Sequence, residues 1–443
     1  MTLMPYVELS DAFRRGRTTP LAVMEQVLER LDAIEPGLHA FVYLERAGAL
    51  ARAAESAARW RAGRPLSPID GMAIGVKDII ETADMPTGQG SPAWAGTRTG
   101  RDAASVQALR EAGAIILGKT TTTEFASTEP FHDTRNPHDP ARTPGGSSSG
   151  SAAAVGAGIL PAAIGSQVVG STLRPASYCG CVGFKPSFGA LNRGGSFDHL
   201  SQSCVGLLAA SPEDAWCVAA AIARRVGGDP GHAALAGPET PPDIRRPARL
   251  GVLRTAGWAR ATPGAQAAFE AALDRLRARG AVVVQNGHAA LREAEDALRD
   301  ALPLTFRIFD WEWLWPLGAY ERERPGSVSA PMRQWLERAR TMSPADYGAA
   351  LAEREAIRGR YAALRGSFDA VIALGATGAA PAGLGWTGDP AANVPASLLG
   401  IPAITLPLLE DEGLPLGLQL LGQAGDDAAL ISVARSIWQE WNA

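Results

Sequence analysis

Segments with helical periodicity alternate with short apolar segments along most of this chain, and this alternation restricts its fold more than any other feature. A threonine cap and a first-turn proline, Thr19-Pro20, start one helical pattern, and residues 72–76 form a short apolar run that delivers Lys77 at its end. Such an alternation favours a mostly parallel sheet with helices on its faces. We therefore predict an α/β protein.

Further segments continue the alternation to the C-terminus. Helices are predicted over 49–62, 103–111, 152–160, 212–224, 265–278 and 344–364, and strands over 114–117, 250–253, 281–284, 370–374 and 403–406. A Gly/Pro-rich connection covers 226–247. Because no linker is long or polar enough to divide the chain, we expect a single domain over 1–443.

Composition excludes several classes of protein. The 443 residues carry a net charge of −4 without basic runs, which argues against a nucleic-acid or anionic-membrane partner. The apolar runs are too short to cross a bilayer, and residues 1–20 do not read as a secretory signal, so we expect a cytoplasmic protein. Cys179, Cys181, Cys204 and Cys217 lack metal-finger spacing and are expected to be buried free thiols.

Lysine is scarce in this chain. It occurs only at Lys77, Lys119 and Lys185, although the sequence has 42 basic residues. Arginine keeps its proton in proteins, whereas lysine can lose it when it is desolvated. A position that needs lysine for its chemistry is therefore one of these three.

Between residues 143 and 195 the chain is rich in glycine, serine and alanine and almost free of charge. The run passes directly into an apolar helical pattern, unlike a flexible linker, and N–H groups at such a junction suit an anion or an oxyanion. A phosphate-binding loop is disfavoured because Ser151-Ala152 follows Gly150 where lysine would be needed.

Two serine chemistries remain for this stretch. Gly146–Gly150 matches the pattern of a nucleophile elbow, which would make Ser148 the nucleophile of an α/β-hydrolase, with a downstream base at His199, His232 or His288. The alternative is a serine whose base is one of the scarce lysines.

The chain resembles the amidase signature family, the Ser–Ser–Lys hydrolases that include fatty acid amide hydrolases and the amidase subunit of glutamyl-tRNA amidotransferase. The matching motifs follow one another in the family's order from about residue 20 to 435: Gly75-Val-Lys-Asp78, Gly118-Lys-Thr120, Glu124-Phe125, Asn136-Pro137, Gly145-Gly-Ser-Ser148, Ser171, Cys179-Gly-Cys-Val-Gly-Phe-Lys-Pro186, Gly400-Ile-Pro-Ala403 and Gly413-Leu-Pro-Leu-Gly-Leu-Gln-Leu420. The resemblance implies a large mixed, mostly parallel central β-sheet covered by helices on both faces. It also implies an N-terminal helical region at 1–70, a catalytic core at 71–225 and a variable substrate-pocket and C-terminal part at 226–443.

The resemblance further implies that Ser171 is the nucleophile, Lys77 the base and Ser147 a relay that follows a cis peptide. Lysine can act as this base only if burial lowers its pKa from about 10.4 toward about 7–8. The N–H groups of Val168, Val169 and Gly170, together with that of Ser171, would form the oxyanion hole. Neither a metal nor a cofactor is needed.

Some positions near the nucleophile depart from the common family pattern. Gln167, Val169 and Leu173 stand where an acid, a glycine and an arginine are frequent, and valine cannot adopt positive φ cheaply. Arg174 matches a malonamidase-like branch in which an arginine there holds a substrate carboxylate; a structural arginine is the other interpretation. Gln167, Arg174 and Trp313 are our candidate substrate-binding residues, although we expect at least two of the three tryptophans in the segment 309–315 to pack a helix onto the sheet.

We therefore expect an amidohydrolase that cleaves the C–N bond of a small or medium linear amide through an acyl-enzyme, with carbamates, ureas and aryl amides as open substrate classes. The expected partner is this small molecule, with no nucleic acid and no membrane, and a homodimer is left open. Two alternatives remain: an ammonia-producing subunit of a tRNA-dependent amidotransferase, and an inactive binding protein on the same scaffold.

Overall fold

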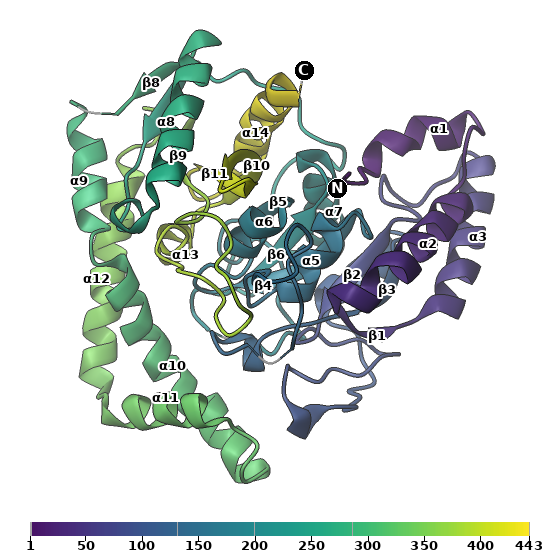
Figure 1. Cartoon of the computed structure of the whole chain (residues 1–443), viewed down its shortest axis with the longest axis horizontal. Helices are drawn as coiled ribbons and strands as arrows, with labels where there is room; N and C mark the ends of the chain where they lie inside the picture. Colours follow the sequence, from purple (N-terminus) through teal and green to yellow (C-terminus); the bar gives the residue numbers. More distant parts are fainter. Residues whose placement is uncertain (1, 131, 199, 286, 443) are drawn as a thin grey trace.

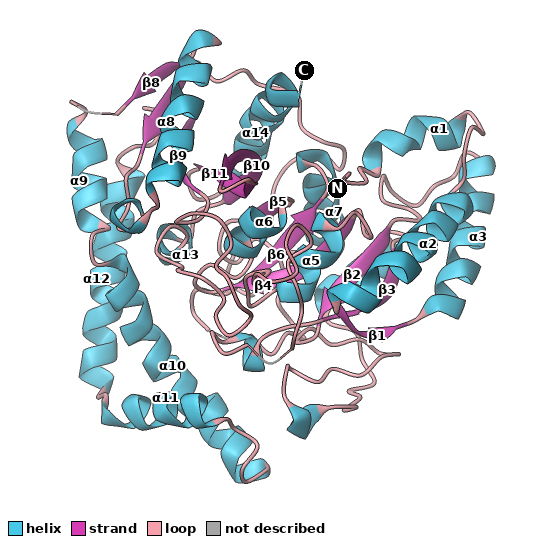
Figure 2. Cartoon of the chain, viewed as in Figure 1, coloured by secondary structure: helices cyan, strands magenta, loops and turns pink. Residues whose placement is uncertain are grey.

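One eleven-stranded sheet runs through the computed structural model, which describes residues 2–130, 132–198, 200–285 and 287–442 (Figure 2). In sheet order the strands are β1 (Phe41–Leu44), β3 (Ile115–Thr120), β2 (Ala73–Lys77), β4 (Ala162–Gln167), β6 (Cys204–Ala209), β5 (Val182–Lys185), β10 (Ala403–Asp411), β11 (Leu414–Leu421), β9 (Ala370–Leu374), β7 (Arg249–Val252) and β8 (Val282–Val284). The sheet therefore takes strands from all parts of the chain.

The sheet is mixed, as expected, but the prediction that it is mostly parallel is wrong. Strand β2 pairs in parallel with β3 and β4, and β7 pairs in parallel with β8 and β9, whereas the other six pairings in the described part of the chain are antiparallel. The physical reason is that β6 lies antiparallel between β4 and β5, and that β10 and β11 form a hairpin through Glu412-Gly413. Neither connection requires a crossover helix.

Helices cover both faces of the sheet, as predicted. One hydrophobic cluster packs the first set against one face: α4 (Ala104–Glu111), α7 (Pro212–Val226), α8 (Pro263–Ala278) and α14 (Asp427–Asn442). Two further clusters contain strand residues of the other face together with the second set of helices, of which α9–α12 pack mainly on one another. This set is α2 (Pro20–Leu38), α3 (Arg46–Arg61), α5 (Ser149–Gly156), α6 (Leu173–Cys179), α9 (Ala289–Ala297), α10 (Ala301–Glu323), α11 (Ala330–Thr341), α12 (Pro344–Ala362) and α13 (Val394–Leu399). The short helix α1 (Ser10–Arg14) adds Phe13 to the first cluster.

The two flanks of the molecule come from different parts of the chain. Figure 1 shows α1–α3 in purple at one side and α9–α12 in green at the other, with the central sheet between them. The N-terminal segment contacts helix α7, which lies in the middle of the sequence. The Asp214 carboxylate of α7 accepts hydrogen bonds from the N–H groups of Tyr6 and Val7 at 2.8–3.1 Å.

Local signals in the sequence identified many elements correctly. Helix α2 begins after Thr19, whose side chain accepts a hydrogen bond from Ala22 N, and the predicted segments at 49–62 and 344–364 are α3 and α12. The predicted helix 152–160 is α5, which begins earlier and ends at Gly156. The Trp-rich segment belongs to α10, a helix that the sequence patterns did not predict.

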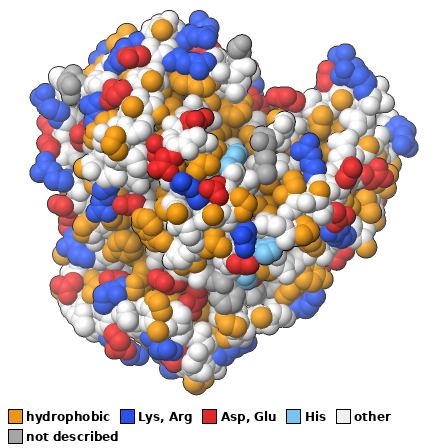
Figure 3. All heavy atoms as spheres, viewed as in Figure 1, with side chains coloured by type: hydrophobic (Ala, Val, Ile, Leu, Met, Phe, Trp, Pro, Cys, Tyr) orange, Lys and Arg blue, Asp and Glu red, His pale blue; other side chains and the backbone are white. Residues whose placement is uncertain are grey.

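The four cysteines are buried free thiols, as predicted. No helix in the described ranges combines the length and the apolar character needed to span a bilayer. On the face drawn in Figure 3, acidic and basic side chains alternate around hydrophobic ones without an extended area of one sign.

Candidate active site

Lys77 lies at the end of β2, a fully buried strand that is third from one edge of the sheet, between β3 and β4. Side chains alternate along the strand, so Ile74 and Val76 enter the cluster around α4 and α7, while Lys77 points to the opposite face, where α5 packs. Its ammonium nitrogen, Nζ, donates hydrogen bonds to Ser147 Oγ at 2.7 Å and to Ser166 Oγ at 2.9 Å.

Burial lowers the pKa of Lys77 to about 7, and the negative charge of Asp198 opposes that shift. The adjacent Asp78 does not face Lys77 as an ion-pair partner, because it pairs with Lys119 at 3.2 Å. Near neutral pH a large fraction of Lys77 is therefore uncharged and able to accept a proton.

Ser147 lies in the loop before α5, and its peptide bond with Gly146 is cis, as the family resemblance implied. Arg174 Nη2 donates to the carbonyl oxygen of Gly146 at 2.8 Å, and Ser149 Oγ donates to that of Gly145 at 2.9 Å. These two bonds hold the loop so that Ser147 meets Lys77.

Ser171 lies in the turn between β4 and α6, and its side chain reaches the wall of a cavity. The N–H of Ser148 donates to the carbonyl oxygen of Ser171 at 3.3 Å, which joins this turn to the loop that carries Ser147. The turn that carries Ser171 is thus joined to the loop whose Ser147 contacts Lys77.

The N–H groups of Val168, Val169, Gly170 and Ser171 have no hydrogen-bond acceptor among the described residues, so they are available to an oxyanion. None of these residues has positive φ, so Val169 fits the turn without a glycine. This removes the one feature that suggested an inactive binding protein.

Gln167 holds this turn from the end of β4. Its Oε1 accepts from the N–H groups of Thr172 and Leu173 at 3.0 Å, and its Nε2 donates to Ser397 Oγ, which donates to the carbonyl oxygen of Val169. Both ends of this amide are occupied and the residue is fully buried. The structure therefore corrects the prediction that Gln167 contacts substrate.

The cavity beside Ser171 has a volume of about 350 Å³. Its inner wall is apolar, and an ion pair between Arg260 and Asp389 at 3.0 Å stands on its rim near the half-exposed Trp386. The apolar wall consists of Val168, Val169, Leu302, Phe306 and Phe309. This cavity can take a compact, largely apolar group next to the serine hydroxyl.

Arg174 also lines the cavity, but most of its donors are engaged. Besides its bond to Gly146, its guanidinium donates to the carbonyl oxygen of Thr387 at 2.7 Å and to Thr387 Oγ1 at 3.2 Å. Only Nη1 lacks a partner among the described residues. Arg174 thus supports the loop and keeps one donor free.

Trp313 is buried in α10 and lines a second, much smaller cavity next to Val168. The neighbouring tryptophans of the segment face outward, since Trp311 stacks on Tyr347 and Trp315 is largely exposed. The Trp-rich segment therefore brings one of its three tryptophans toward the site.

Sequence reasoning missed Ser166, the second partner of Lys77. Ser166 follows Ile164 on β4, the strand that pairs in parallel with β2 through Val76. Knowledge of that pairing would have placed Ser166 beside Lys77, but nothing in the sequence specifies which two strands are neighbours.

The competing serine is excluded as a nucleophile by its contacts. Ser148 is fully buried, and its Oγ donates to the carbonyl oxygen of Ser166 and accepts from the Ser166 N–H, both at 3.3 Å. Of its suggested bases, His232 packs edge-on against Phe188, His288 caps α9, and His199 lies outside the described residues.

The other lysines have structural contacts. Lys119 donates to Thr87 Oγ1 at 2.7 Å besides its pair with Asp78, and Lys185 donates to the carbonyl oxygen of Pro186 at 2.8 Å. Both side chains are fully buried.

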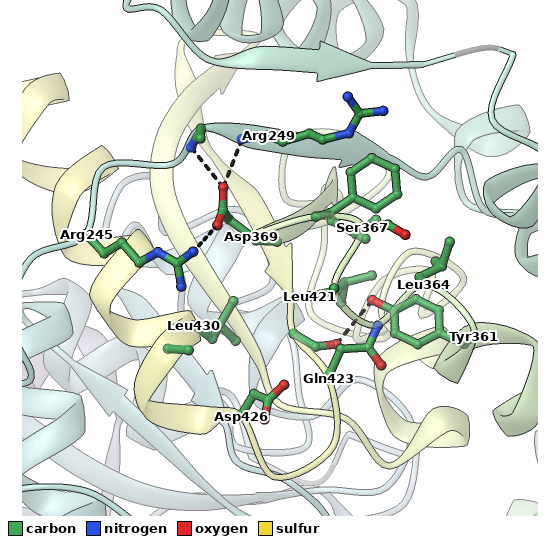
Figure 4. A pocket seen from close by; sticks show the side chains of 17 residues that line it. Arg245, Arg249, Tyr361, Leu364, Ser367, Asp369, Leu421, Gln423, Asp426 and Leu430 are labelled. Carbon is green, nitrogen blue, oxygen red and sulfur yellow. Dashed lines mark hydrogen bonds and ion pairs between the residues drawn. The ribbon is translucent and has the colours of Figure 1, made fainter.

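A larger cavity of about 410 Å³ lies elsewhere, between β7, β9 and α14 (Figure 4). Its central carboxylate, Asp369, is already satisfied by Arg245 at 2.6 Å and by the N–H groups of Ala248 and Arg249. Tyr361 donates to the carbonyl oxygen of Gly422. None of the predicted catalytic residues lines this cavity.

Comparisons with known proteins show what the chain as a whole is similar to. A family model described as Amidase matches residues 22–431. A glutamyl-tRNA(Gln) amidotransferase subunit from Chloroflexus aggregans is 33% identical, with 98% of this chain and 96% of that protein covered.

Solved structures show the same similarity. A crystal structure of an amidase is 29% identical, with a TM-score of 0.84 over 99% of this chain and 100% of the other. The peptide amidase of Stenotrophomonas maltophilia is 30% identical, with a TM-score of 0.79 over 99% of this chain and 97% of the other.

Proposed function

The chain belongs to the amidase signature family, and on this premise we propose that it is an amidohydrolase that cleaves the C–N bond of a small or medium linear amide. We assign Ser171 as the nucleophile, Ser147 as the proton relay and Lys77 as the base. The observation that carries the proposal is the buried Lys77 amine, 2.7 Å from Ser147 Oγ, with a pKa of about 7.

The reaction follows from these positions. Neutral Lys77 accepts the proton of Ser147 while Ser147 accepts that of Ser171, and Ser171 Oγ attacks the amide carbon. The N–H groups at 168–171 stabilise the negative oxygen of the tetrahedral intermediate. The proton returns through Ser147 to the leaving nitrogen as the C–N bond breaks, and water then hydrolyses the ester on Ser171 by the same route.

The cavity supports a substrate with a compact apolar acyl group. Five apolar residues line the cavity, and two of its four charged lining residues, Arg260 and Asp389, form an ion pair; the other two are Glu129 and Arg174. A carboxylate on the acyl group could reach only Nη1 of Arg174, the one guanidinium nitrogen without a partner among the described residues. Carbamates, ureas and aryl amides remain within the proposal, because they form the same type of acyl-enzyme.

Arg174→Ala tests the carboxylate contact. The substitution also frees the carbonyl oxygen of Gly146, so the overall rate will fall whether or not the arginine binds substrate. The informative quantity is the ratio of kcat/KM for an anionic amide to that for its neutral analogue. A carboxylate contact predicts that this ratio falls by about 10- to 100-fold; an unchanged ratio would contradict the contact.

A second candidate is an ammonia-producing subunit of a tRNA-dependent amidotransferase. The relative from Chloroflexus aggregans favours it, because the similarity covers nearly the whole of both chains. The two functions differ in what the purified chain does alone. Turnover of simple amides by the single chain supports the stand-alone enzyme, and activity only with added partner proteins supports the alternative.

Fluorophosphonate labelling tests the assignment of the nucleophile. We expect the reagent to modify wild type at Ser171, Ser171→Ala to lose both labelling and amide turnover, and Ser148→Ala to keep both. Turnover lost in Ser148→Ala and retained in Ser171→Ala would overturn the assignment. Circular dichroism of each variant separates loss of chemistry from loss of the fold.

A further inference from the structure

A second, small and closed cavity, which we call the cell, adjoins the substrate cavity on the far side of Val168. Ala126 and Val168 line both spaces, and Asp198, Leu200, Trp313 and Pro316 complete most of the cell wall. The space open to the centre of a water-sized molecule is about 10 Å³, which accommodates one such molecule.

Two polar atoms of the cell wall have no hydrogen-bond partner among the described residues: Asp198 Oδ2, an acceptor, and Trp313 Nε1, a donor. Both residues are well over nine-tenths buried, with exposed fractions of 7% and 4%. Leaving such a group unpaired costs about 1–3 kcal/mol. A small molecule that both donates and accepts hydrogen bonds would satisfy the two atoms together, and both ammonia and water have this property.

Asp198, which lines the cell, acts electrostatically on Lys77, the base from which the leaving nitrogen would receive its proton. The leaving nitrogen receives its proton from the relay between Lys77 and Ser147, and the carboxylate of Asp198 is near enough to Lys77 to oppose its loss of charge. The apolar wall of the substrate cavity, which suits the acyl group, extends instead toward Phe306 and Phe309. Acyl and leaving groups would therefore occupy opposite sides of Val168.

We propose that Asp198 and Trp313 form a leaving-group site that holds a single ammonia-sized molecule and so selects primary amides over N-alkyl amides. This inference rests on the proposed amidohydrolase function and adds which amide nitrogen the site accepts. In acylation the Ser171 Oγ–carbon bond forms and the carbon–nitrogen bond breaks, and the Ser171 proton ends on the departing nitrogen as NH3. The Trp313 N–H donates to the lone pair of this nitrogen, and Asp198 accepts one of its N–H bonds.

The same cell can place the water that hydrolyses the acyl-enzyme, because water must approach along the path by which ammonia leaves. The water gives one proton through Ser147 to Lys77 and its oxygen to the acyl carbon. The products are the free carboxylic acid and the regenerated Ser171 hydroxyl.

A series of amides with one acyl group and a growing nitrogen substituent tests the size limit. We expect wild type to prefer the primary amide over the N-methyl and N-propyl amides by about 100-fold or more in kcat/KM, because the cell has no room for added carbon. Trp313→Ala, which enlarges the cell, is expected to raise the N-propyl to primary amide ratio by about tenfold or more.

A second pair of variants tests the hydrogen bond. Trp313→Phe keeps the ring but removes the N–H, and is expected to lower kcat for the primary amide by about tenfold with little change in KM. Trp311→Phe is the matched control on the same helix, because its ring stacks on Tyr347 away from the cell, and it should match wild type.

Fluorophosphonate labelling separates failure of this inference from failure of the proposed function, because its leaving group, fluoride, is a single atom that carries no nitrogen substituent. If Ser171 is labelled and wild type cleaves the N-propyl amide as fast as the primary amide, the leaving-group site is wrong and the amidohydrolase stands. If Trp313→Phe is labelled and hydrolyses the primary amide at the wild-type rate, the proposed role of the Trp313 N–H is wrong. If wild type is neither labelled nor active on any amide, the proposed function itself fails.

Discussion

At Lys77, the burial that produces a base at neutral pH also destabilises the folded protein. Its pKa falls from 10.5 to about 7 because the charged form loses its hydration. Between these two pH values the unfolded chain binds a proton that the folded chain does not bind. Stability therefore increases as pH rises through this window, and the full cost of burying the amine is present below about pH 7.

Lys77→Met should therefore abolish turnover and stabilise the protein. We expect the variant to be more stable than wild type by about 2–4 kcal/mol near neutral pH, after the loss of two hydrogen bonds is deducted. The gain should shrink as the pH is raised toward 10.5. Urea unfolding of both proteins at several pH values measures it, and a variant less stable than wild type at every pH would contradict a buried, neutral amine.

Ser166 should tune the base, because its hydroxyl is one of the two acceptors for Lys77 Nζ. A hydrogen bond to the charged amine favours the charged form, so Ser166→Ala should lower the pKa of Lys77 further. The acid limb of the kcat/KM profile is then expected to move to lower pH, with a rate on the plateau reduced by about tenfold or less. An acid limb that stays where wild type has it would exclude this role.

The residues of the site differ in how far the sequence could predict them. The scarcity of lysine reduced the candidate bases to three positions, and the family resemblance selected Lys77 among them and added Ser147 and Ser171. The part played by Gln167 was not predictable, because a buried glutamine before the nucleophile can equally face substrate or cap a turn. Its contact with Ser397 joins positions 230 residues apart, and no local pattern encodes such a contact.

Among the elements, the turn between β4 and α6 determines the geometry of the oxyanion site. It is held at two points, by Gln167 Oε1 at the N-terminus of α6 and by Ser397 Oγ on the carbonyl oxygen of Val169. Because Ser397 belongs to α13, the position of the turn depends on an element from the C-terminal part of the chain.

Ser397→Ala should loosen this turn without changing the cavity wall, since Ser397 does not line the cavity. We expect kcat to fall by about tenfold and KM to change little, because the N–H groups of the turn act mainly on the transition state. Ser56→Ala, which removes a buried hydroxyl far from the site in α3, is the control for a small buried cavity. A change confined to KM would contradict a positioning role.

The predicted and the missed elements differ in their local sequence signals. Helix α2 has a side-chain cap, a first-turn proline and a clear apolar stripe, so its sequence is sufficient to predict it. Strand β4, with the sequence Ala-Ala-Ile-Gly-Ser-Gln, has few residues that favour strands, and it is stable because β2 and β6 pair with it on both sides. Helix α10 lacks an N-terminal side-chain cap and contains Pro316.

At the scale of the whole molecule, the sheet joins regions that are distant in sequence. Strand β5 of the predicted catalytic core pairs with β10 from the C-terminal part, and β1 from the N-terminal region pairs with β3. The order of these strands was not predictable, because the sequence patterns reveal strands but not their neighbours. We propose on this basis that residues 1–443 form a single domain.

A single domain should unfold in one transition. Tryptophans lie in both halves of the chain, including the buried Trp216 and Trp313, so their fluorescence reports on both. We expect the fluorescence and far-UV circular dichroism transitions to coincide with the loss of activity. Two separated transitions would instead show that the chain contains two independently unfolding domains.

A fragment covering residues 1–225 also tests the proposal that the chain forms a single domain. It would leave β5 without β10 and expose the surfaces that α14 covers on one face and α13 on the other, so we expect it to aggregate or remain unfolded. A soluble fragment with a cooperative unfolding transition would show that the core folds independently of the C-terminal part.

The most direct test of the central claim is the pH dependence of fluorophosphonate labelling at Ser171. If Lys77 removes the proton through Ser147, the labelling rate should rise tenfold per pH unit below about pH 7 and reach a plateau above it. Lys77→Met should lose this rise together with nearly all labelling. A wild-type rate that is independent of pH across this range, or rapid labelling of folded Lys77→Met, would contradict the assignment of Lys77 as the base.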